Sequence, residues 1–383
     1  MFYFLLIIAI GLPLVAPQRY KYVALIGSML VLFIPWGLQY EMTQDWDMNF
    51  ERWTMVNIEH RLEFESGRVI EPLYAYLMTL FFPKFGFFTW LMTCAVIELS
   101  VIFYFIRKYT LSSLYWVVLF VLMMNPNYGL LYINSNRQML SVVFSMFAVI
   151  LMLYNMENRL LARFWRTIIL SIGVVSLIYL GTQIHTGATF AYLLVPVYLY
   201  VKNRERSQKW LMLLIFNALY FSRFFLNIDD IMVISMFQVD DFDIAGFESY
   251  LEEFSNTDRS YSLVEQPLYF LIMNAAIWFY NELDTPHRFF AICGILGIIG
   301  DGFVINTLSR ILCYFNIYML FLIPRLVECC EEHKTENSLI FVRAVYTLLI
   351  LYGLFMFYKC QTQGEYYTRW ADFKTIFSAP HWM

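Results

Sequence analysis

Charged side chains are scarce in this sequence, and the short motifs that mark many soluble enzymes are absent. Asp, Glu, Lys and Arg make up 15% of the 383 residues, whereas a soluble domain carries about a quarter. The sequence contains no P-loop, no G-x-G-x-x-G, no H-E-x-x-H and no G-x-S-x-G. An ATP-driven or metal-dependent mechanism therefore has no sequence support, and we expect no cofactor.

Charge, the first residues and cysteine spacing exclude further classes. The net charge is -4, and basic composition gives no indication of a nucleic-acid partner. Residues 2–16 are apolar, but Arg19 and Lys21 follow them, which favours a retained helix over a cleaved signal peptide. No cysteine has C-x-x-C or other metal-ligand spacing, so we expect core residues or free thiols at Cys94, Cys293, Cys313, Cys329, Cys330 and Cys360.

Long apolar runs dominate what is present. The chain is 60% hydrophobic and 20% aromatic, with a mean hydropathy of +0.58. The runs are about as long as a bilayer is thick, so we predict an all-α polytopic integral membrane protein whose residues 1–383 form a single transmembrane domain. About 12 transmembrane helices are expected, at 3–17, 23–38, 86–106, 113–126, 138–156, 167–183, 186–201, 210–225, 263–281, 289–307, 309–327 and 339–358.

Two long acidic segments interrupt the apolar runs. Residues 39–85 hold an acidic loop and a stretch, 72–82, that is too short to span, and Pro72 predicts the start of a re-entrant or interfacial helix there. The second acidic segment is 226–262. With twelve spans the basic loops share one side of the membrane, so both acidic segments and both termini are predicted at the outer face.

A polar cluster over 134–138 opens one predicted span and is the first candidate site. A guanidinium offers five donors that match phosphate oxygens, and a helix N-terminus adds free N–H groups and a positive dipole end. Arg137 and Gln138 are therefore candidate phosphate ligands on the outer face. The alternatives for Arg137 are an interfacial anchor or a partner for an acid.

Two further candidates fall on the same predicted face. Arg310 begins the eleventh span, where a second arginine could complete a clamp for pyrophosphate; a snorkelling anchor is the alternative. His185 lies in the turn 181–187 between two spans. Because histidine titrates near neutrality, His185 can act as a base or as a hydrogen-bond donor, and a satisfied structural histidine is the alternative.

The first acidic segment contributes aromatic and acidic candidates. Trp46 and Tyr74 could stack on a sugar face through their amphipathic rings, or belong to a membrane-interface belt. Asp45 stands beside Trp46, and Glu71 stands at the predicted helix start, where it would also cap N–H groups. Both acids are candidate substrate ligands, and a solvated loop is the alternative reading for the segment.

These motifs, in this order, resemble the EpsG-type membrane proteins. The resemblance rests on Asp45, on the runs 68–74 (RVIEPLY) and 136–141 (NRQMLS), on the turn 184–187 (IHTG) and on 309–315 (SRILCYF). It covers most of the chain. EpsG-type proteins belong with the Wzy-like polymerases of capsule, O-antigen and exopolysaccharide repeat units.

The resemblance implies a GT-C-like helical fold and glycosyl transfer at the outer face of the bacterial cytoplasmic membrane. The growing glycan would leave undecaprenyl pyrophosphate and join a lipid-linked repeat unit, without a metal or nucleotide sugar. Arg137 and Arg310 would neutralise the departing pyrophosphate. His185, which we favour, or Asp45 or Glu71 would accept the proton of the acceptor hydroxyl. Membrane lipids surround such an enzyme, and a chain-length regulator is a further candidate partner.

Three other functions stay open. A flippase or transporter of the same lipid-linked sugar would line a path across the membrane, whereas the candidates here gather on one face. An O-antigen ligase would use the same donor with another acceptor, so the sequence does not separate it from a polymerase. A membrane acyltransferase would leave the outer arginines unexplained.

Overall fold

Among the residues that the structure describes, all secondary-structure elements longer than a single β-bridge are helices. The computed structural model describes residues 2–41, 45–64, 69–80, 86–110, 114–124, 128, 133, 135–157, 163–203, 207–222, 265–303, 312–333, 336–362 and 374–378. Within these ranges, β-pairing is limited to two isolated bridges, Gln39 with Thr375 and Glu63 with Val69. The predicted all-α fold is thus confirmed for this part of the chain.

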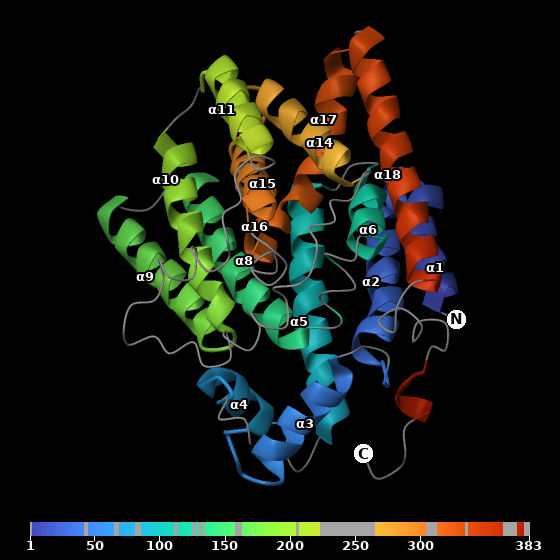
Figure 1. The fold of residues 1–383 in the computed structure, drawn as a ribbon, viewed down its shortest axis with the longest axis vertical. Helices are drawn as coiled ribbons and strands as arrows, with labels where there is room; N and C mark the ends of the chain where they lie inside the picture. Colours follow the sequence, from blue (N-terminus) through green and yellow to red (C-terminus); the bar gives the residue numbers. More distant parts are fainter. Residues whose placement is uncertain are drawn as a thin grey trace.

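The helices pack as an elongated bundle with a smaller helical unit at one end (Figure 1). In chain order they are α1 (Phe2–Val15), η1 (Gln18–Tyr20), α2 (Lys21–Gly37), α3 (Trp46–Asn57), α4 (Pro72–Thr79), α5 (Gly86–Tyr109), α6 (Tyr115–Met124), α8 (Asn136–Glu157), α9 (Arg163–Thr182), η3 (Thr186–Leu193), α10 (Leu194–Asn203), α11 (Lys209–Ser222), α14 (Glu265–Trp278), α15 (Thr285–Phe303), α16 (Cys313–Asn316), α17 (Met319–His333), α18 (Glu336–Thr362) and η5 (Ile376–Ser378).

Helix length only partly supports the predicted number of spans. Four stretches are long and apolar enough to cross a membrane: Gln18–Gly37, Gly86–Tyr109, Asn136–Met156 and Cys313–Glu332. Every predicted span overlaps helical residues, but the remaining apolar helices have 10–17 residues. The structure therefore supports a multi-pass membrane protein, while twelve spans and a GT-C-like arrangement stay predictions.

Helix α5 runs from the smaller helical unit into the middle of the bundle (Figure 1). It packs against α2 on one side and against α8 on the other, and α8 in turn packs along α9. The positions Ala95, Leu99, Ile102 and Phe105 of α5 are buried, as their helical spacing requires for one covered face. Glu98 lies in the same buried stretch, where the Trp36 indole N–H donates to its Oε2 at 2.6 Å.

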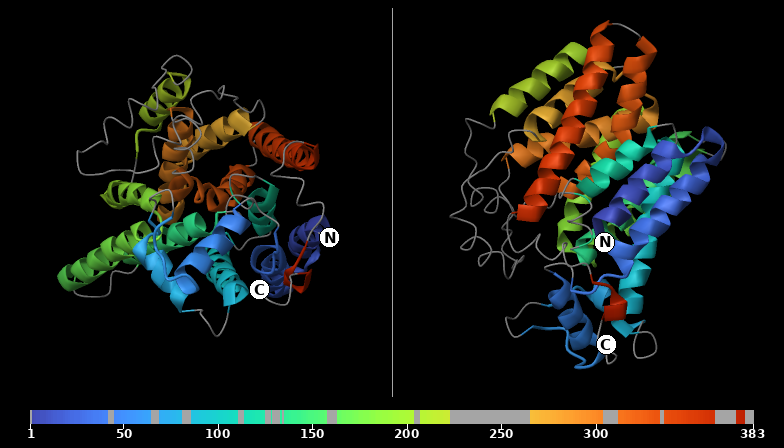
Figure 2. Two further views of the ribbon diagram at one scale, coloured as in Figure 1. Left: turned by 60° about the horizontal axis from the view of Figure 1, so that its bottom comes forward. Right: turned by 90° about the vertical axis from the view of Figure 1, so that its right-hand side faces the viewer.

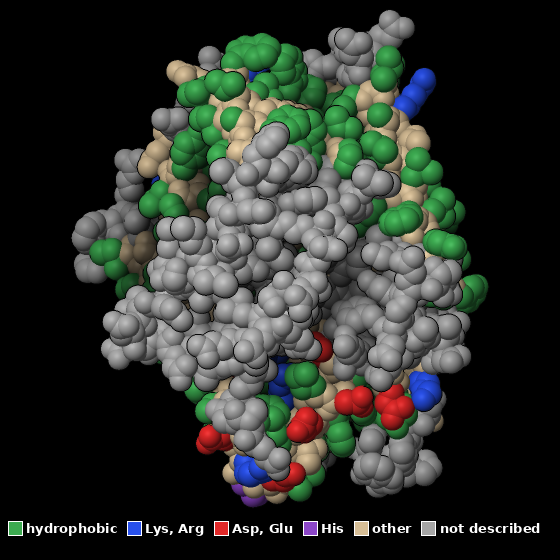
Figure 3. All heavy atoms as spheres, in the orientation of Figure 1, with side chains coloured by type: hydrophobic (Ala, Val, Ile, Leu, Met, Phe, Trp, Pro, Cys, Tyr) green, Lys and Arg blue, Asp and Glu red, His purple; other side chains and the backbone are tan. Residues whose placement is uncertain are grey.

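Helices α3 and α4 with the first turns of α5 form a separate unit, here called the α3–α4 end, which projects beyond the bundle (Figure 2). Helix α3 was not predicted, because the segment 39–71 was taken as an acidic loop. Its buried residues Trp46, Asn49, Trp53 and Val56 are spaced three, four and three apart, so α3 covers one face and leaves its acids in solvent. Carboxylates accordingly gather at this end of the surface (Figure 3).

A short segment near the end of the chain pairs with the residues that follow α2. Tyr40 N–H donates to the Lys374 carbonyl at 3.2 Å, and Ile376 N–H donates to the Leu38 carbonyl at 3.0 Å. Lys374 Nζ also pairs with Glu41 Oε2 at 3.1 Å. This segment therefore holds the connection between α2 and α3 in place.

Candidate functional site

The starts of helices α3, α4 and α8 meet at the α3–α4 end. Ser135, directly before α8, donates its hydroxyl to Asp45 Oδ2 at 3.0 Å, and Asp45 stands directly before α3. Helix α4 begins at Pro72, as predicted, because proline lacks the N–H that a first helical position leaves unpaired. Three positive helix dipole ends thus lie together, an arrangement that favours bound anions.

An ion pair between Arg137 and Glu71 joins α8 to α4. Arg137 Nη1 lies 2.5 Å from Glu71 Oε2, with side-chain exposures of 25% and 14%. The sequence left open whether Arg137 binds a phosphate, anchors in the interface or partners an acid, and in this structure the partner is Glu71. The expected capping by Glu71 is wrong: its side chain makes no cap hydrogen bond, because the carboxylate is engaged by Arg137.

Arg52 of α3 is a second guanidinium at this site, and it was missed in the sequence. Its position seven residues after Asp45 places both on one face of α3. Burial lowers the pKa of Arg52, and the positive charge of Arg137 lowers it further, so the two arginines are electrostatic neighbours. The helical spacing of the buried residues in α3 was the signal that could have revealed it.

The His185 turn packs against the start of α4. Leu73 N–H, in the first turn of α4, donates to the Gln183 carbonyl at 3.1 Å. His185 stands before η3, and its Nδ1 accepts from Gly187 N–H at 3.1 Å, so His185 caps that helix. The turn is tight, since a Cβ at Gly187 would lie 2.8 Å from His185 Nδ1 and 3.8 Å from Tyr314 Cε2.

Tyr314 and Cys313 of α16 connect the His185 turn with α8. The hydroxyls of Tyr314 and Ser141 lie 2.5 Å apart, and the Gln138 amide donates to Cys313 Sγ at 3.2 Å. Gln138 is buried and occupied by this contact, so it orients α8 against α16 in the present state. The structure therefore brings Asp45, Glu71, Arg137, Gln138 and His185 into one neighbourhood. That this neighbourhood lies at the outer face of the membrane stays a prediction.

The predicted sugar stacking by Trp46 and Tyr74 does not fit the structure. Trp46 is 3% exposed, and its ring is covered by Tyr40, Phe50 and Phe87. Tyr74 is fully buried with its ring against Trp90. The aromatic residues of this segment form a core that supports α3 and α4, because an isolated amphipathic unit must bury its apolar face.

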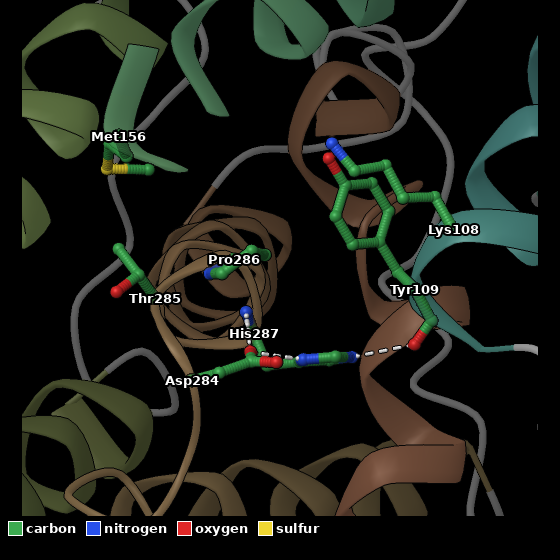
Figure 4. A pocket seen from close by; sticks show the side chains of 7 residues that line it. All are labelled: Lys108, Tyr109, Met156, Asp284, Thr285, Pro286 and His287. Atoms are coloured by element: carbon green, nitrogen blue, oxygen red, sulfur yellow. Dashed lines mark hydrogen bonds and ion pairs between the residues drawn. The ribbon is translucent and has the colours of Figure 1, made fainter. Parts of the chain in front are cut away.

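A cavity at the opposite end of α5 has a different character. It encloses about 390 Å³ and is lined by Lys108, Tyr109, Met156, Asp284, Thr285, Pro286 and His287. His287 uses Nδ1 toward the Asp284 carboxylate and Nε2 toward the Tyr109 carbonyl, the latter at 3.1 Å (Figure 4). These contacts fasten the start of α15 to the end of α5, so the polar groups here are structural.

Some predicted features lie outside the described residues, namely Arg310 and the acidic segment 226–262. Of the described cysteines, Cys94, Cys293, Cys313, Cys329 and Cys330 are free and buried, as expected. Within the described ranges no cluster of three metal-ligating side chains occurs.

The apolar helices and their packing define a multi-pass helical membrane protein with a polar site at one end of the bundle. Residues 22–372 match the family model described as the EpsG family, so the chain belongs to the EpsG family. That family is associated with polymerisation of polysaccharides by glycosyl transfer, which supports a polymerase-type role in polysaccharide biosynthesis. No curated protein and no solved structure matches the chain.

Proposed function

We propose that this protein joins oligosaccharide repeat units carried on undecaprenyl pyrophosphate, by metal-independent glycosyl transfer at the outer face of the bacterial cytoplasmic membrane. The observation that carries the proposal is the meeting of Arg137, Glu71 and the His185 turn at the α3–α4 end. A reaction that releases pyrophosphate needs a cation for the leaving group and a base for the attacking hydroxyl. Both side-chain types are present there on rigid helix starts.

The proposed roles follow from the chemistry of the bond change. The acceptor hydroxyl oxygen bonds to the anomeric carbon of the donor while the bond from that carbon to the pyrophosphate oxygen breaks. His185 takes the hydroxyl proton on Nδ1, the ring nitrogen whose lone pair accepts from Gly187 N–H in this structure, so that capping bond is given up as the proton moves. The electron pair of the broken bond stays on the pyrophosphate, where Arg137 stabilises the added charge. Arg310 remains a predicted second cation for the same leaving group.

A flippase is the second candidate, since it would bind the same lipid-linked sugar. The position of the site favours the polymerase, because Arg137 and His185 lie at helix starts near one end of the bundle and not along its length. A ligase differs from a polymerase only in its acceptor, so the two are separated by the substrates supplied.

The test uses purified full-length protein in detergent with its lipid-linked repeat unit as the sole substrate. Wild type is expected to give a ladder of repeat multiples, and Arg137→Ala, His185→Ala and Arg310→Ala are expected to lose it. Arg61→Ala is the matched control, since Arg61 lies in the same acidic segment but pairs with Glu59 at the exposed surface. Passage of the lipid across a vesicle membrane without any ladder would instead identify a flippase.

A further inference from the structure

The guanidinium of Arg52 has fewer hydrogen-bond and charge partners in this structure than a partly buried arginine usually has. Its Nη1 donates to Asn49 Oδ1 at 3.1 Å and its Nη2 contacts Met48 Sδ, both neutral acceptors on its own helix. Its Nε is buried and has no hydrogen-bond partner. Among the described residues, no carboxylate lies within ion-pairing distance of Arg52. Burying a guanidinium that has an unpaired N–H and no anionic partner costs folding free energy. A bound ligand that accepts from this N–H and supplies negative charge would offset that cost.

The hydroxyl of Tyr74 is a second incomplete group at the same place. Tyr74 is fully buried, and its hydroxyl proton finds no acceptor in the part of the chain that the structure describes. Burial raises the pKa of Tyr74, while the charges of Arg52 and Arg137 both act to lower it, so both guanidiniums lie within electrostatic range of this hydroxyl. The Trp90 indole acts on the same oxygen as a donor, which leaves the hydroxyl proton itself without an acceptor.

The hydrogen-bond balance at this point favours an added acceptor, such as a phosphate oxygen. Two guanidiniums, Arg52 and Arg137, are close enough to repel each other, and one carboxylate, Glu71, is paired with Arg137 alone. Asp45 is engaged by the Ser135 hydroxyl. Two carboxylates, Glu71 and Asp45, therefore act on the two arginines, and the groups left over are donors: the buried Tyr74 hydroxyl proton and the Arg52 Nε–H find no acceptor within the described ranges.

We propose that Arg52, Arg137 and the Tyr74 hydroxyl form a binding site for a pyrophosphate group, in which Glu71 is the resident counter-ion that pyrophosphate displaces. The inference rests on the proposed function for the identity of the pyrophosphate, which would be that of the lipid-linked donor. Arg52, from α3, is thereby assigned as a further cation for this pyrophosphate, in addition to Arg137 and the predicted Arg310. Tyr74 contributes through its hydroxyl and not through its ring face.

The role of Glu71 gives the site a predicted order of events. A carboxylate paired with Arg137 occupies the position that a phosphate oxygen would take, since both are matched by the same guanidinium fork. Binding of pyrophosphate therefore frees Glu71 close to the reacting sugar. Substitution of Glu71 by glutamine removes the competing charge while keeping the size of the side chain.

The experiment measures the affinity of the full-length protein for inorganic pyrophosphate by calorimetry, in a neutral detergent. Arg52→Gln and Arg137→Gln are each expected to weaken binding about tenfold or more, and Tyr74→Phe by less. Glu71→Gln is expected to strengthen binding about tenfold. Arg61→Gln is the control, with unchanged affinity, because Arg61 belongs to an exposed pair.

The outcomes are distinct for the site and for the function. Wild-type affinity in Arg52→Gln, or an affinity in Glu71→Gln that is unchanged or weaker, overturns the site. The Glu71→Gln variant binds pyrophosphate more tightly only if the Glu71 carboxylate competes with pyrophosphate. This measurement therefore tests the proposed site even if an arginine variant does not fold. Loss of pyrophosphate binding in Arg52→Gln, together with no ladder from wild type, keeps the site and rejects the polymerase.

A final comparison separates two sources of phosphate. Binding of pyrophosphate is measured again in nanodiscs of phosphatidylcholine alone and of phosphatidylcholine with phosphatidylglycerol. Unchanged affinity in both supports a pyrophosphate site. Competition by phosphatidylglycerol that disappears in Arg52→Gln would mean that the site holds a phospholipid headgroup, which overturns the assignment.

Discussion

The two ends of α5 carry acid–base pairs of different construction. At the α3–α4 end, Arg137 and Glu71 are 66 positions apart in sequence and join the starts of two helices. At the other end, His287 pairs with Asp284, three residues before it, within the first turn of α15. The first pair depends on tertiary folding, whereas the second forms within one local stretch of chain.

The difference between the ends lies in how well their polar groups are satisfied. Both ring nitrogens of His287 have partners, so its imidazole offers no open nitrogen to a ligand in the cavity. Around Arg137, in contrast, Arg52 Nε, the Tyr74 hydroxyl and Asn136 Oδ1 are buried without hydrogen-bond partners. Buried polar atoms are normally paired, so such a concentration marks a place for a ligand better than an open cavity does.

The largest expected effect tests the α3–α4 end through His185. His185→Asn keeps a side-chain acceptor for Gly187 N–H but removes the base, so we expect ladder formation to slow by roughly 10²–10⁴-fold with the fold intact. His60→Asn is the control, since His60 is exposed at φ 54°, a conformation that asparagine tolerates. A His185→Asn enzyme as fast as wild type would assign the proton to another group.

Arg137→Lys tests whether geometry matters at this end beyond charge. Lysine keeps a cation for Glu71 but loses the planar fork that matches a phosphate, so we expect the rate of ladder formation to fall about 10- to 100-fold. Thermal stability should change little, because the ion pair persists. Equal rates for the two enzymes would reduce Arg137 to a structural partner of Glu71.

Tyr314→Phe has a smaller expected effect, on the contact between α16 and α8. The variant removes the hydroxyl that Ser141 meets, which should lower the stability by about 1 kcal/mol in thermal unfolding. Tyr318→Phe provides the comparison, since the buried Tyr318 hydroxyl has no hydrogen-bond partner to lose. Equal stabilities for both variants would show that the Ser141 contact contributes nothing.

Asp284→Ala should have the smallest effect on activity, because Asp284 pairs with His287 at the end of α5 that lies opposite the α3–α4 end. Burial acts to raise the pKa of Asp284, but the hydrogen bond and charge of His287 outweigh it and lower the pKa. A carboxylate with a lowered folded pKa stabilises the fold above its unfolded pKa of about 3.9, and that contribution is lost as the pH falls through the folded value. Asp284 Oδ1 also accepts from His287 N–H at 3.0 Å and so caps α15. At pH 7 we expect about 1 kcal/mol less stability from the loss of this cap, with an unchanged ladder.

Apolar periodicity was sufficient to predict the helical bundle but not the composition of the site. The runs that became α5 and α8 were visible because each is a long stretch of apolar residues. The grouping of Glu71, Arg137 and His185 was expected from their shared face and is present in the structure. The sequence could not choose a partner for Arg137, since that choice depends on how α4 docks on α8.

The aromatic residues and Arg52 show why the rest could not be predicted. Trp46 and Tyr74 suited a sugar platform by residue type, yet the acidic segment folds into helices that need those rings as their core. Arg52 looked like one base in an acidic loop because α3 has little overall hydrophobicity. Its neighbour Arg137 is 85 positions away, so only tertiary structure could place the two together.

The pairing of residues 38–40 with residues 374–376 has a consequence for biogenesis. Lys374 and Glu41 are 333 positions apart, so the ribosome has made every helix from α1 to α18 before this contact can form. The junction that leads into α3 is therefore secured only after the helices α1 to α18 have been synthesised. A nascent chain that stalls before residue 374 has these helices but lacks the contact that holds the connection between α2 and α3.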